Sequence, residues 1–401
     1  MKVLHVIQTL SGRFGGPVVS LKALARNQVD EGHQVTICTT NSDYPKGTLR
    51  VKTNTSEIEN GVAVWYHPVQ FKPLLYSKQL RKWINANIKK FDIVHIHGLY
   101  RFPVTYAAWV ARKERVPYVV TPHGALDPFI YRQSKHSVLL KRLYEKMFDI
   151  PNLNGASAIN YATQEELERA RFLGLDAPSA MVSHGIDWGL YEELPPKGSF
   201  RARLGIESDT PLVLFLGRIN FKKGIDLLIP AFSKVAKFLP GTRLAIVGPD
   251  NDNLGLKVRH WCKDLGIDHM VVMVDHINPD QVRQAYVDAN LFVLPSYSEN
   301  FGMAVVESMA CGCPVVISDQ VNIHDEVKKY GVGIVVKLDS DEIAKAIHSI
   351  LTCKTAAREM GDAGRRLAKT RFDYEVIVAK VNRMYGAAIQ FSSNNNIEIF
   401  P

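Results

Sequence analysis

Short apolar runs alternate with helical patterns along most of the 401 residues of this chain. Residues 3–7, 35–38, 93–96 and 118–120 have the composition of buried strands, and residues 17–31 have the apolar spacing of a helix. This alternation predicts parallel sheets whose strands are connected by crossover helices. We therefore expect an α/β protein built from doubly wound domains.

Two domains are expected, because the chain is longer than a single domain usually is. The alternation pauses at residues 187–210, a polar stretch with two consecutive prolines that reads as a linker, and it resumes at the apolar run 212–216. We predict a first domain over residues 1–187, a second domain over residues 188–371, and a loosely held tail over residues 390–401.

The composition limits the class of protein and its compartment. An apolar fraction of 46% is enough for two cores, and no apolar run approaches the ~18 residues that a membrane span needs. Five cysteines without a repeated spacing do not form a disulfide framework, and Cys311 and Cys313 lack a second pair for a zinc site. The first residues lead directly into a strand rather than a signal peptide. We expect a cytoplasmic protein that is soluble or peripheral to a membrane.

The net charge of +9 is concentrated in one region. Residues 60–148 contain 15 Lys and Arg against 4 Asp and Glu, a net charge of +11, which leaves −2 for the rest of the chain. Such an excess suits nucleic acid, an anionic membrane or a phosphorylated substrate. We see no nucleic-acid-binding motif that supports the first of these.

Two glutamates follow the strand-like run 291–294. Glu299 and Glu307 bracket seven residues, and a helical pattern begins between them at Met303. We expect Glu299 at the carboxyl end of the strand and Glu307 about two turns into the helix. Free N–H groups at a helix start suit an anion, and a carboxylate just inside the helix can accept hydrogen bonds from sugar hydroxyls. This pairing predicts a nucleotide-sugar site.

The stretch from Glu299 to Glu307 resembles the E-x7-E signature of the retaining nucleotide-sugar glycosyltransferases of family 4, and the match continues through Gly312 and Pro314. The resemblance implies the GT-B fold, in which two doubly wound Rossmann-like domains face each other across a cleft. The first domain would bind the acceptor and the second the donor. The last helix, expected at residues 372–389, would pack back on the first domain.

A basic loop after the strand-like run 212–216 is similar to the G-R-x-x-x-x-K-G element of the same family. All four marked positions are present: Gly217, Arg218, Lys223 and Gly224. The two cationic side chains could neutralise a diphosphate leaving group. The alternative for this loop alone is a basic turn that contacts only water.

The resemblance also implies roles for the residues of the carboxylate motif. Glu307 would bind the ribose hydroxyls of the donor, and Glu299 would hold its sugar. Backbone amides beside Glu299 would help to hold that sugar; they belong to Phe301, Gly302 and Met303.

Candidate residues in the first domain follow predicted strands. Gly15 and Gly16 form a glycine-rich loop whose amides can approach the diphosphate or the acceptor. His123 follows the run 118–120, at the edge where open α/β sheets bind ligands, and the family commonly has a histidine there that faces the donor sugar. His97 is a weaker acceptor-site candidate, and His95 is expected in the core.

Two further positions depend on the resemblance. His276 and Ile277 would line the nucleotide base through backbone groups, which does not separate uridine from guanosine. His184 stands where the family usually has asparagine, and this departure leaves a sugar contact at that position open.

The resemblance implies a retaining, metal-independent transfer without a cofactor. A hexose-type sugar would pass from a UDP- or GDP-sugar to a glycan or lipid-linked acceptor in polysaccharide, lipopolysaccharide or glycolipid biosynthesis. The acceptor would attack the face that the diphosphate leaves, and the diphosphate would take the acceptor's proton.

A basic amphipathic helix is predicted over residues 131–148, and residues 72–90 contain no acidic side chain. Such segments can lie on an anionic membrane. Alternatively, the apolar stripe of the helix packs on its own sheet.

Three other functions remain open. A nonhydrolysing sugar-nucleotide 2-epimerase would interconvert UDP-sugars without an acceptor. A catalytically inactive scaffold would bind the donor without transfer. A protein that binds nucleic acid or another acidic polymer would bind DNA in a salt-dependent way and would not bind nucleotide sugars.

Overall fold

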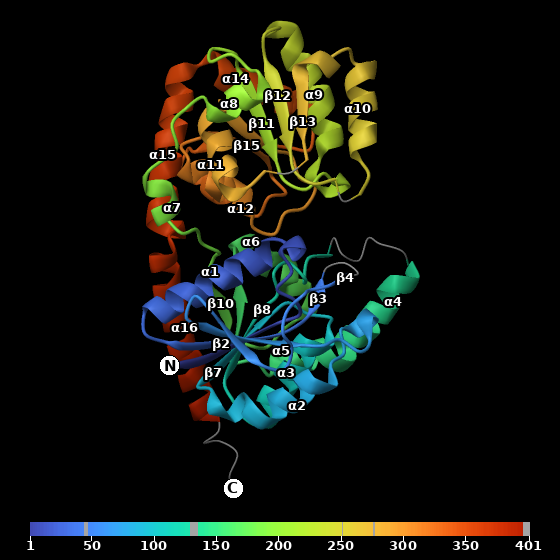
Figure 1. Cartoon of the computed structure of the whole chain (residues 1–401), viewed down its shortest axis with the longest axis vertical. Coiled ribbons are helices and arrows are strands. Elements are labelled where there is room, and N and C mark those ends of the chain that lie inside the picture. The colour runs from blue at the N-terminus through green and yellow to red at the C-terminus, as the bar shows by residue number, and fades with distance from the viewer. Residues whose placement is uncertain (44–46, 129–134, 251, 276, 396–401) are drawn as a thin grey trace. The chain divides into compact units, whose positions relative to one another are not determined.

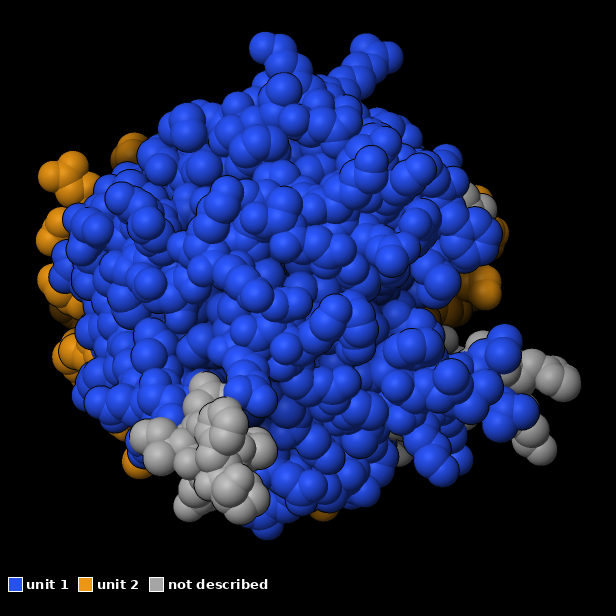
Figure 2. All heavy atoms as spheres, turned by 90° about the horizontal axis from the view of Figure 1, so that it is seen from below, with its two compact units in different colours: residues 1–185, 374–401 blue, residues 186–373 orange. Residues whose placement is uncertain are grey.

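The computed structural model describes residues 1–43, 47–128, 135–250, 252–275 and 277–395. Contacts divide the chain into two compact units (Figures 1 and 2). Unit 1 contains residues 1–185 and 374–401, and unit 2 contains residues 186–373. The boundaries expected from the sequence were 187 and 371, against 185 and 373 here.

Unit 1 is built on an eight-stranded sheet in the order β10-β9-β8-β7-β1-β2-β6-β5. Its neighbouring strands are parallel except for β5 and β6, which are antiparallel. The strands are β1 (Lys2–Ile7), β2 (Gln34–Thr40), β5 (Ser56–Glu59), β6 (Val62–His67), β7 (Ile93–His97), β8 (Tyr118–Thr121), β9 (Ala158–Tyr161) and β10 (Ser179–Met181). A separate ribbon pairs β3 (Ser42–Asp43) with β4 (Gly47–Thr48).

Helices cover both faces of this sheet. They are α1 (Gly16–Asp30), α2 (Lys78–Asn87), α3 (Phe102–Lys113), α4 (Lys135–Tyr144), α5 (Ile150–Asn154), α6 (Gln164–Ala170) and α16 (Tyr374–Asn395). Short helical turns are η1 (Gly12–Phe14), η2 (Lys72–Leu74), η3 (Ile88–Lys90), η5 (Glu145–Asp149) and η6 (Arg171–Leu173).

Strand β1 shows how the core of unit 1 is divided, because successive side chains of a strand point to opposite faces. Leu4 and Val6 belong to a buried cluster with apolar residues of α2 and α3. Val3 packs in a cluster with α16, and Ile7 packs in one with α1. The intervening His5 therefore projects into the α1 and α16 side of the sheet.

Unit 2 is built on a six-stranded sheet in the order β13-β12-β11-β14-β15-β16, in which all neighbours are parallel. The strands are β11 (Leu212–Leu216), β12 (Arg243–Val247), β13 (Val271–Val274), β14 (Leu291–Leu294), β15 (Val315–Ser318) and β16 (Gly333–Val336). The helices and turns are α7 (Gly189–Glu192), α8 (Ser199–Leu204), η7 (Phe221–Lys223), α9 (Ile225–Phe238), α10 (Gly255–Asp264), η8 (Asp268–Met270), α11 (Pro279–Asp288), α12 (Met303–Ala310), α13 (His324–Lys329), α14 (Ser340–Thr352) and α15 (Lys354–Phe372). The prediction of doubly wound α/β domains is confirmed.

The predicted linker at residues 187–210 is instead a folded part of unit 2. The carboxylate of Asp288 accepts hydrogen bonds from the backbone amides of Phe200 and Arg201, at 2.7 and 3.0 Å. The buried guanidinium of Arg201 donates to the carbonyl oxygen of Thr210 at 2.6 Å. Polar composition suggested a linker, and most polar side chains of this stretch are exposed, but Arg201 is buried and its hydrogen bonds hold the segment in unit 2.

Residues 390–395, which were predicted to belong to a loosely held tail, are part of a helix. Helix α16 continues through residue 395, and the hydroxyls of Ser157 and Ser392 are 2.7 Å apart. The remainder of the predicted tail lies outside the described residues. The contacts place α16 in unit 1, which is blue in Figure 2.

The strand order determines where a ligand would bind in each unit. In unit 1 the order reverses between β1 and β7, and in unit 2 it reverses between β11 and β14. Crevices at the carboxyl ends of such strands are the usual ligand sites of open α/β sheets. No helix among the described residues is long and apolar enough to cross a bilayer.

Candidate functional site

In unit 2, the loop after β11 packs closely against the end of β14. Gly224 has a φ of +68°, and a Cβ atom there would lie 1.9 Å from the carbonyl oxygen of Pro295. Only glycine allows this approach. The loop therefore carries Lys223 to the segment that follows β14.

Lys223 and Glu299 form an ion pair whose side chains are 16% and 22% exposed. The backbone around the carboxylate is fixed, since the amide of Glu299 donates to the carbonyl oxygen of Gln320 at 3.1 Å. Arg218 is exposed on the same loop as Lys223. The structure thus brings two of the predicted residues together and leaves a second cationic side chain exposed on the loop.

The positions of the two glutamates differ in detail from the expectation. Strand β14 ends at Leu294, so Glu299 lies in the following loop rather than directly at the strand end. Gly302 takes the left-handed conformation with φ +88°, and α12 begins after it at Met303. Glu307 is therefore just over one turn into the helix, not two.

Glu307 has a perturbed carboxyl group. The hydroxyl of Tyr286 donates to one carboxylate oxygen at 3.4 Å. Burial raises the pKa of Glu307 to about 7, against a smaller lowering by the Tyr286 hydrogen bond. The carboxylate is therefore short of hydrogen-bond donors and well suited to accept more of them.

The amino end of α12 offers backbone groups rather than side chains. The first N–H groups of a helix have no partner within it, and here they include those of Met303 and Ala304, whereas the N–H of Val305 donates to the carbonyl oxygen of Gly302 at 2.8 Å. The side chain of Phe301 is buried and packs edge-on against Phe372, with ring centroids 5.8 Å apart. It can therefore contribute only its backbone to a ligand.

The loop that was predicted to contact the nucleotide base is only partly within the described residues. Ile277 is buried, and His276 lies outside the described residues.

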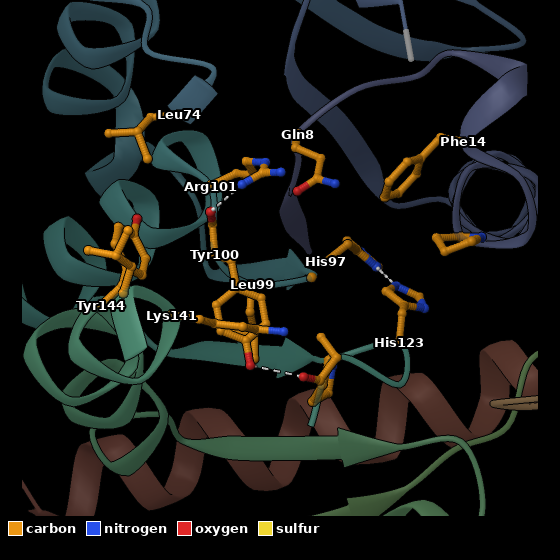
Figure 3. Close-up of a pocket in the computed structure, with 15 residues that line it drawn as sticks. Gln8, Phe14, Leu74, His97, Leu99, Tyr100, Arg101, His123, Lys141 and Tyr144 are labelled. Carbon is orange, nitrogen blue, oxygen red and sulfur yellow. Dashed lines mark hydrogen bonds between the residues drawn. The ribbon is translucent and has the colours of Figure 1, made fainter. Parts of the chain in front are cut away.

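In unit 1, a cavity of about 680 Å³ lies at the carboxyl end of the sheet near β7 (Figure 3). Figure 3 shows His97 and His123 pointing toward one another on one side, with Lys141 and Tyr144 on another. The remaining lining residues are Gln8, Phe14, Pro17, Leu74, Gly98, Leu99, Tyr100, Arg101, Pro122, Ala125 and Leu140. The described lining contains cationic side chains and no carboxylate.

His123 is held in an unusual backbone conformation. Its φ of +53° is in the left-handed region, which is uncommon for residues other than glycine and occurs often at functional sites. Its Nε2 lies 3.1 Å from Nδ1 of His97, and its ring stacks on that of His184 with centroids 5.1 Å apart. His95 is in the core, as expected.

The glycine-rich loop of unit 1 leads into α1. Gly15 has a φ of +90°, and α1 begins at Gly16 with Pro17 in its first turn. No atom lies within 4 Å of a Cβ built on either glycine, so the described structure leaves open space there.

Sequence reasoning missed several cavity residues. The ammonium of Lys141 lies 4.2 Å from the centroid of the Tyr100 ring. Arg101 follows Tyr100 in the chain and also lines the cavity. The signal was present in the basic and aromatic pattern of residues 131–148, which was interpreted only as a surface.

Two family models match this chain. The model described as glycosyl transferases group 1 matches residues 196–367, and that of the glycosyl transferase 4-like domain matches residues 15–185. This chain belongs to the group 1 glycosyltransferases.

An uncharacterised glycosyltransferase of Methanocaldococcus jannaschii is 27% identical to it over 372 residues, which cover 88% of this chain and 89% of that protein. The sucrose-phosphate synthase of Thermosynechococcus elongatus superposes with a TM-score of 0.77 at 22% identity, covering 96% of this chain and 98% of that one. Anabaena HepE in complex with UDP-glucose superposes with a TM-score of 0.73 at 18% identity, covering 96% of this chain and 100% of that one. The predicted family and its GT-B fold of two Rossmann-like domains are confirmed for this glycosyltransferase.

Proposed function

We propose that this glycosyltransferase is retaining and metal-independent, and that it transfers a hexose-type sugar from a UDP- or GDP-sugar to a glycan or lipid-linked acceptor. The main support for the proposal is the Lys223–Glu299 ion pair at the carboxyl edge of the unit 2 sheet, with Arg218 exposed on the same loop as Lys223. Glu307, on the first turns of α12, is the fourth side chain of the proposed donor site.

These groups suit the departure of a nucleoside diphosphate. The ammonium of Lys223 has three donors, of which one is directed to Glu299, so two can bind diphosphate oxygens. Arg218 and the amides at the start of α12 add further positive potential. As the sugar–oxygen bond to the diphosphate breaks, the acceptor oxygen bonds to the same face of the sugar, and its proton passes to the diphosphate.

Support for the donor class comes from HepE, which was solved with UDP-glucose. We therefore assign a nucleoside diphosphate sugar to the unit 2 site. Thermal stabilisation by UDP, GDP, ADP, dTDP and their sugar conjugates tests this assignment. A ligand at ~100 times its dissociation constant adds about 2.7 kcal/mol to the folded-state stability. We expect one donor to raise the thermal stability of the protein, and we expect Glu307→Ala to lose this stabilisation. No stabilisation by any of these ligands would favour a different class of ligand.

Turnover tests the cationic pair directly. Arg218→Ala or Lys223→Ala should each reduce turnover on the order of 10²-fold, comparable with the loss of one preorganised donor. Lys222→Ala is the charge-matched control on the same loop and should have a much smaller effect. A double variant that keeps the wild-type rate would overturn the assignment. Products formed from a UDP-sugar without an acceptor would instead favour the epimerase.

For the acceptor, we propose the basic cavity of unit 1. Its cationic and aromatic lining suits an anionic acceptor with an apolar part. Helix α4 contributes Leu140 and Lys141 to this cavity and also carries strongly exposed apolar side chains: Leu139 (70%), Leu140 (71%) and Leu143 (54%). These three leucines therefore do not pack on the sheet of unit 1, which favours the membrane interpretation over the alternative.

Flotation with anionic vesicles tests this membrane contact. We expect salt-sensitive binding that is lost in a Leu139→Ser, Leu143→Ser variant. Phe238→Ser is the control, because Phe238 is 74% exposed on unit 2 and lies outside the basic region. Absence of salt-sensitive binding by the unmodified protein would count against the membrane contact.

A further inference from the structure

A row of histidines lies in the core of unit 1. His5 on β1 is paired in register with His95 on β7, and Ile7 is paired with His97. The three imidazoles are 0%, 2% and 4% exposed, and one nitrogen of each lies within 4.8 Å of the others. That spacing could hold a metal ion. However, each of the six ring nitrogens has a hydrogen-bond partner, so the described geometry is that of a hydrogen-bonded network.

One branch of this network connects the core to the cavity. Oε1 of Gln28 on α1 lies 2.7 Å from Nε2 of His5. Nδ1 of His5 lies 2.9 Å from Nε2 of His97, and Nδ1 of His97 lies 3.1 Å from Nε2 of His123. Four side chains from four segments of the chain thus form one continuous relay, and its last two members, His97 and His123, line the cavity (Figure 3).

The proton positions in this relay follow from the chemistry of its first member. Burial lowers the pKa of His5 to about 4 and lowers those of His97 and His123 well below the ordinary value, so all three rings are neutral. A neutral imidazole has one donor and one acceptor nitrogen, which allows a chain of them only two arrangements. An amide oxygen can only accept, so Nε2 of His5 carries the proton. Consequently Nε2 of His97 donates to His5, and Nε2 of His123 donates to His97.

The Gln28 amide has a second partner. Its nitrogen donates to the hydroxyl of Tyr385 at 3.5 Å. That hydroxyl lies 2.7 Å from Nδ1 of His95, and Nε2 of His95 lies 2.7 Å from the hydroxyl of Thr121. This second branch ends within the core and does not reach His123.

The far end of the relay lacks a partner. Nδ1 of His123 is buried and has no hydrogen-bond partner among the described residues. A buried acceptor without a partner is destabilising, and a hydroxyl group of a ligand would satisfy it. The left-handed backbone of His123 and its stacking on His184 fix where this acceptor lies.

We propose that Gln28, acting through His5 and His97, holds His123 as its Nε2–H tautomer and thereby presents an unprotonated Nδ1 to a hydroxyl of the bound substrate. Gln28, His5 and His97 are positioning residues, and His123 is the group that contacts the ligand. The contact with substrate rests on the proposed glycosyl transfer, whereas the tautomer does not.

Ring nitrogen spectra of the full chain labelled with ¹⁵N-histidine test the tautomer in the free protein. His123 is assigned by comparison with His123→Asn. We expect a neutral ring protonated at Nε2. A ring protonated at Nδ1, a charged ring, or stoichiometric metal on the cluster in the purified protein would overturn the relay. The tautomer is measured in the unaltered protein, and His123→Asn serves only to assign its signal, so the proposal stays testable even where Gln28→Met fails to fold.

Gln28→Met then removes the amide at similar volume, and Thr121→Val deletes a buried hydroxyl of the other branch. We expect a mixed tautomer for His123 and about a tenfold loss in kcat/KM in the first variant, with neither change in the second. An unchanged tautomer in folded Gln28→Met overturns the relay, and a changed tautomer with unchanged kcat/KM overturns the contact with substrate. Wild-type protein that shows the expected tautomer but no transfer from any nucleotide sugar would contradict the proposed function and leave the relay standing.

Discussion

At the scale of single residues, Glu307 couples ligand binding to pH. Its pKa is raised to about 7 by burial, and ribose hydroxyls that donate to the carboxylate would favour its charged form. Donor binding should therefore tighten as the pH rises from 6 to 8 and then level off, with release of up to one proton per ligand at the lower pH. Titration calorimetry in two buffers of different ionisation enthalpy measures this release. Glu307→Gln should bind more weakly and without the pH dependence; wild-type affinity that is constant over this range would contradict the role.

The same carboxyl group affects stability in the free protein. Its pKa is raised from an ordinary 4.5 to about 7 in the folded state, so the folded state binds more protons between these values. The contribution to stability is fully present below pH 4.5 and is lost as the pH rises through 7. Urea unfolding should show Glu307→Gln gaining stability relative to wild type between pH 5 and pH 8, by about 1–3 kcal/mol. An equal difference at both pH values would mean that the carboxyl group is not desolvated.

At the scale of elements, the contact between the β11–α9 loop and the end of β14 depends on Gly224. Alanine there would place its Cβ atom 1.9 Å from a carbonyl oxygen and would have to adopt φ +68°. We expect a loss of at least about 2 kcal/mol in the free energy of unfolding. Gly241→Ala is the matched control in unit 2, because no atom lies within 4 Å of its Cβ position, and it should change stability by under about 0.5 kcal/mol. Comparable losses of unfolding free energy in the two variants would show that the close approach at Gly224 is not the cause of the destabilisation.

Many elements of unit 2 could be predicted from the sequence. The runs 212–216 and 291–294 coincide with β11 and β14. Strands of a parallel sheet are buried on both faces, so their apolar runs are uninterrupted and easily recognised. The loop glycines and the carboxylate motif were recognised because they stand directly beside such runs.

The histidine relay could not be predicted in the same way. His97 and His123 were candidates, but the other members of the relay, His5 and Gln28, lie elsewhere in the chain, on β1 and α1. Apolar periodicity indicates which residues face a core, not which strands are neighbours or how they are registered. The anchoring of Arg201 by Asp288 escaped prediction for the same reason, since both residues read as solvated polar side chains.

At the scale of the whole molecule, α16 belongs to the unit that begins the chain. Tyr374, Ile377, Val378 and Tyr385 lie in one buried cluster with side chains of β1, β7 and β8. Most helices of unit 1 connect strands that are close in sequence, whereas α16 is separated from them by all of unit 2. The folding of unit 1 therefore depends on the last helix of the chain.

A chain that ends at residue 373 tests this dependence. It lacks the part of the unit 1 core that α16 contributes but keeps every strand of both sheets, so we expect β1, β7 and β8 to lose protection from hydrogen exchange. In β11 and β14 the amides should stay protected, because the core of unit 2 lies within residues 186–373. A chain that ends at residue 395 is the control, since it retains the described length of α16, and it should exchange like the full protein. Undiminished protection of β1 and β7 in the shorter chain would show that the first 185 residues fold without the returning helix.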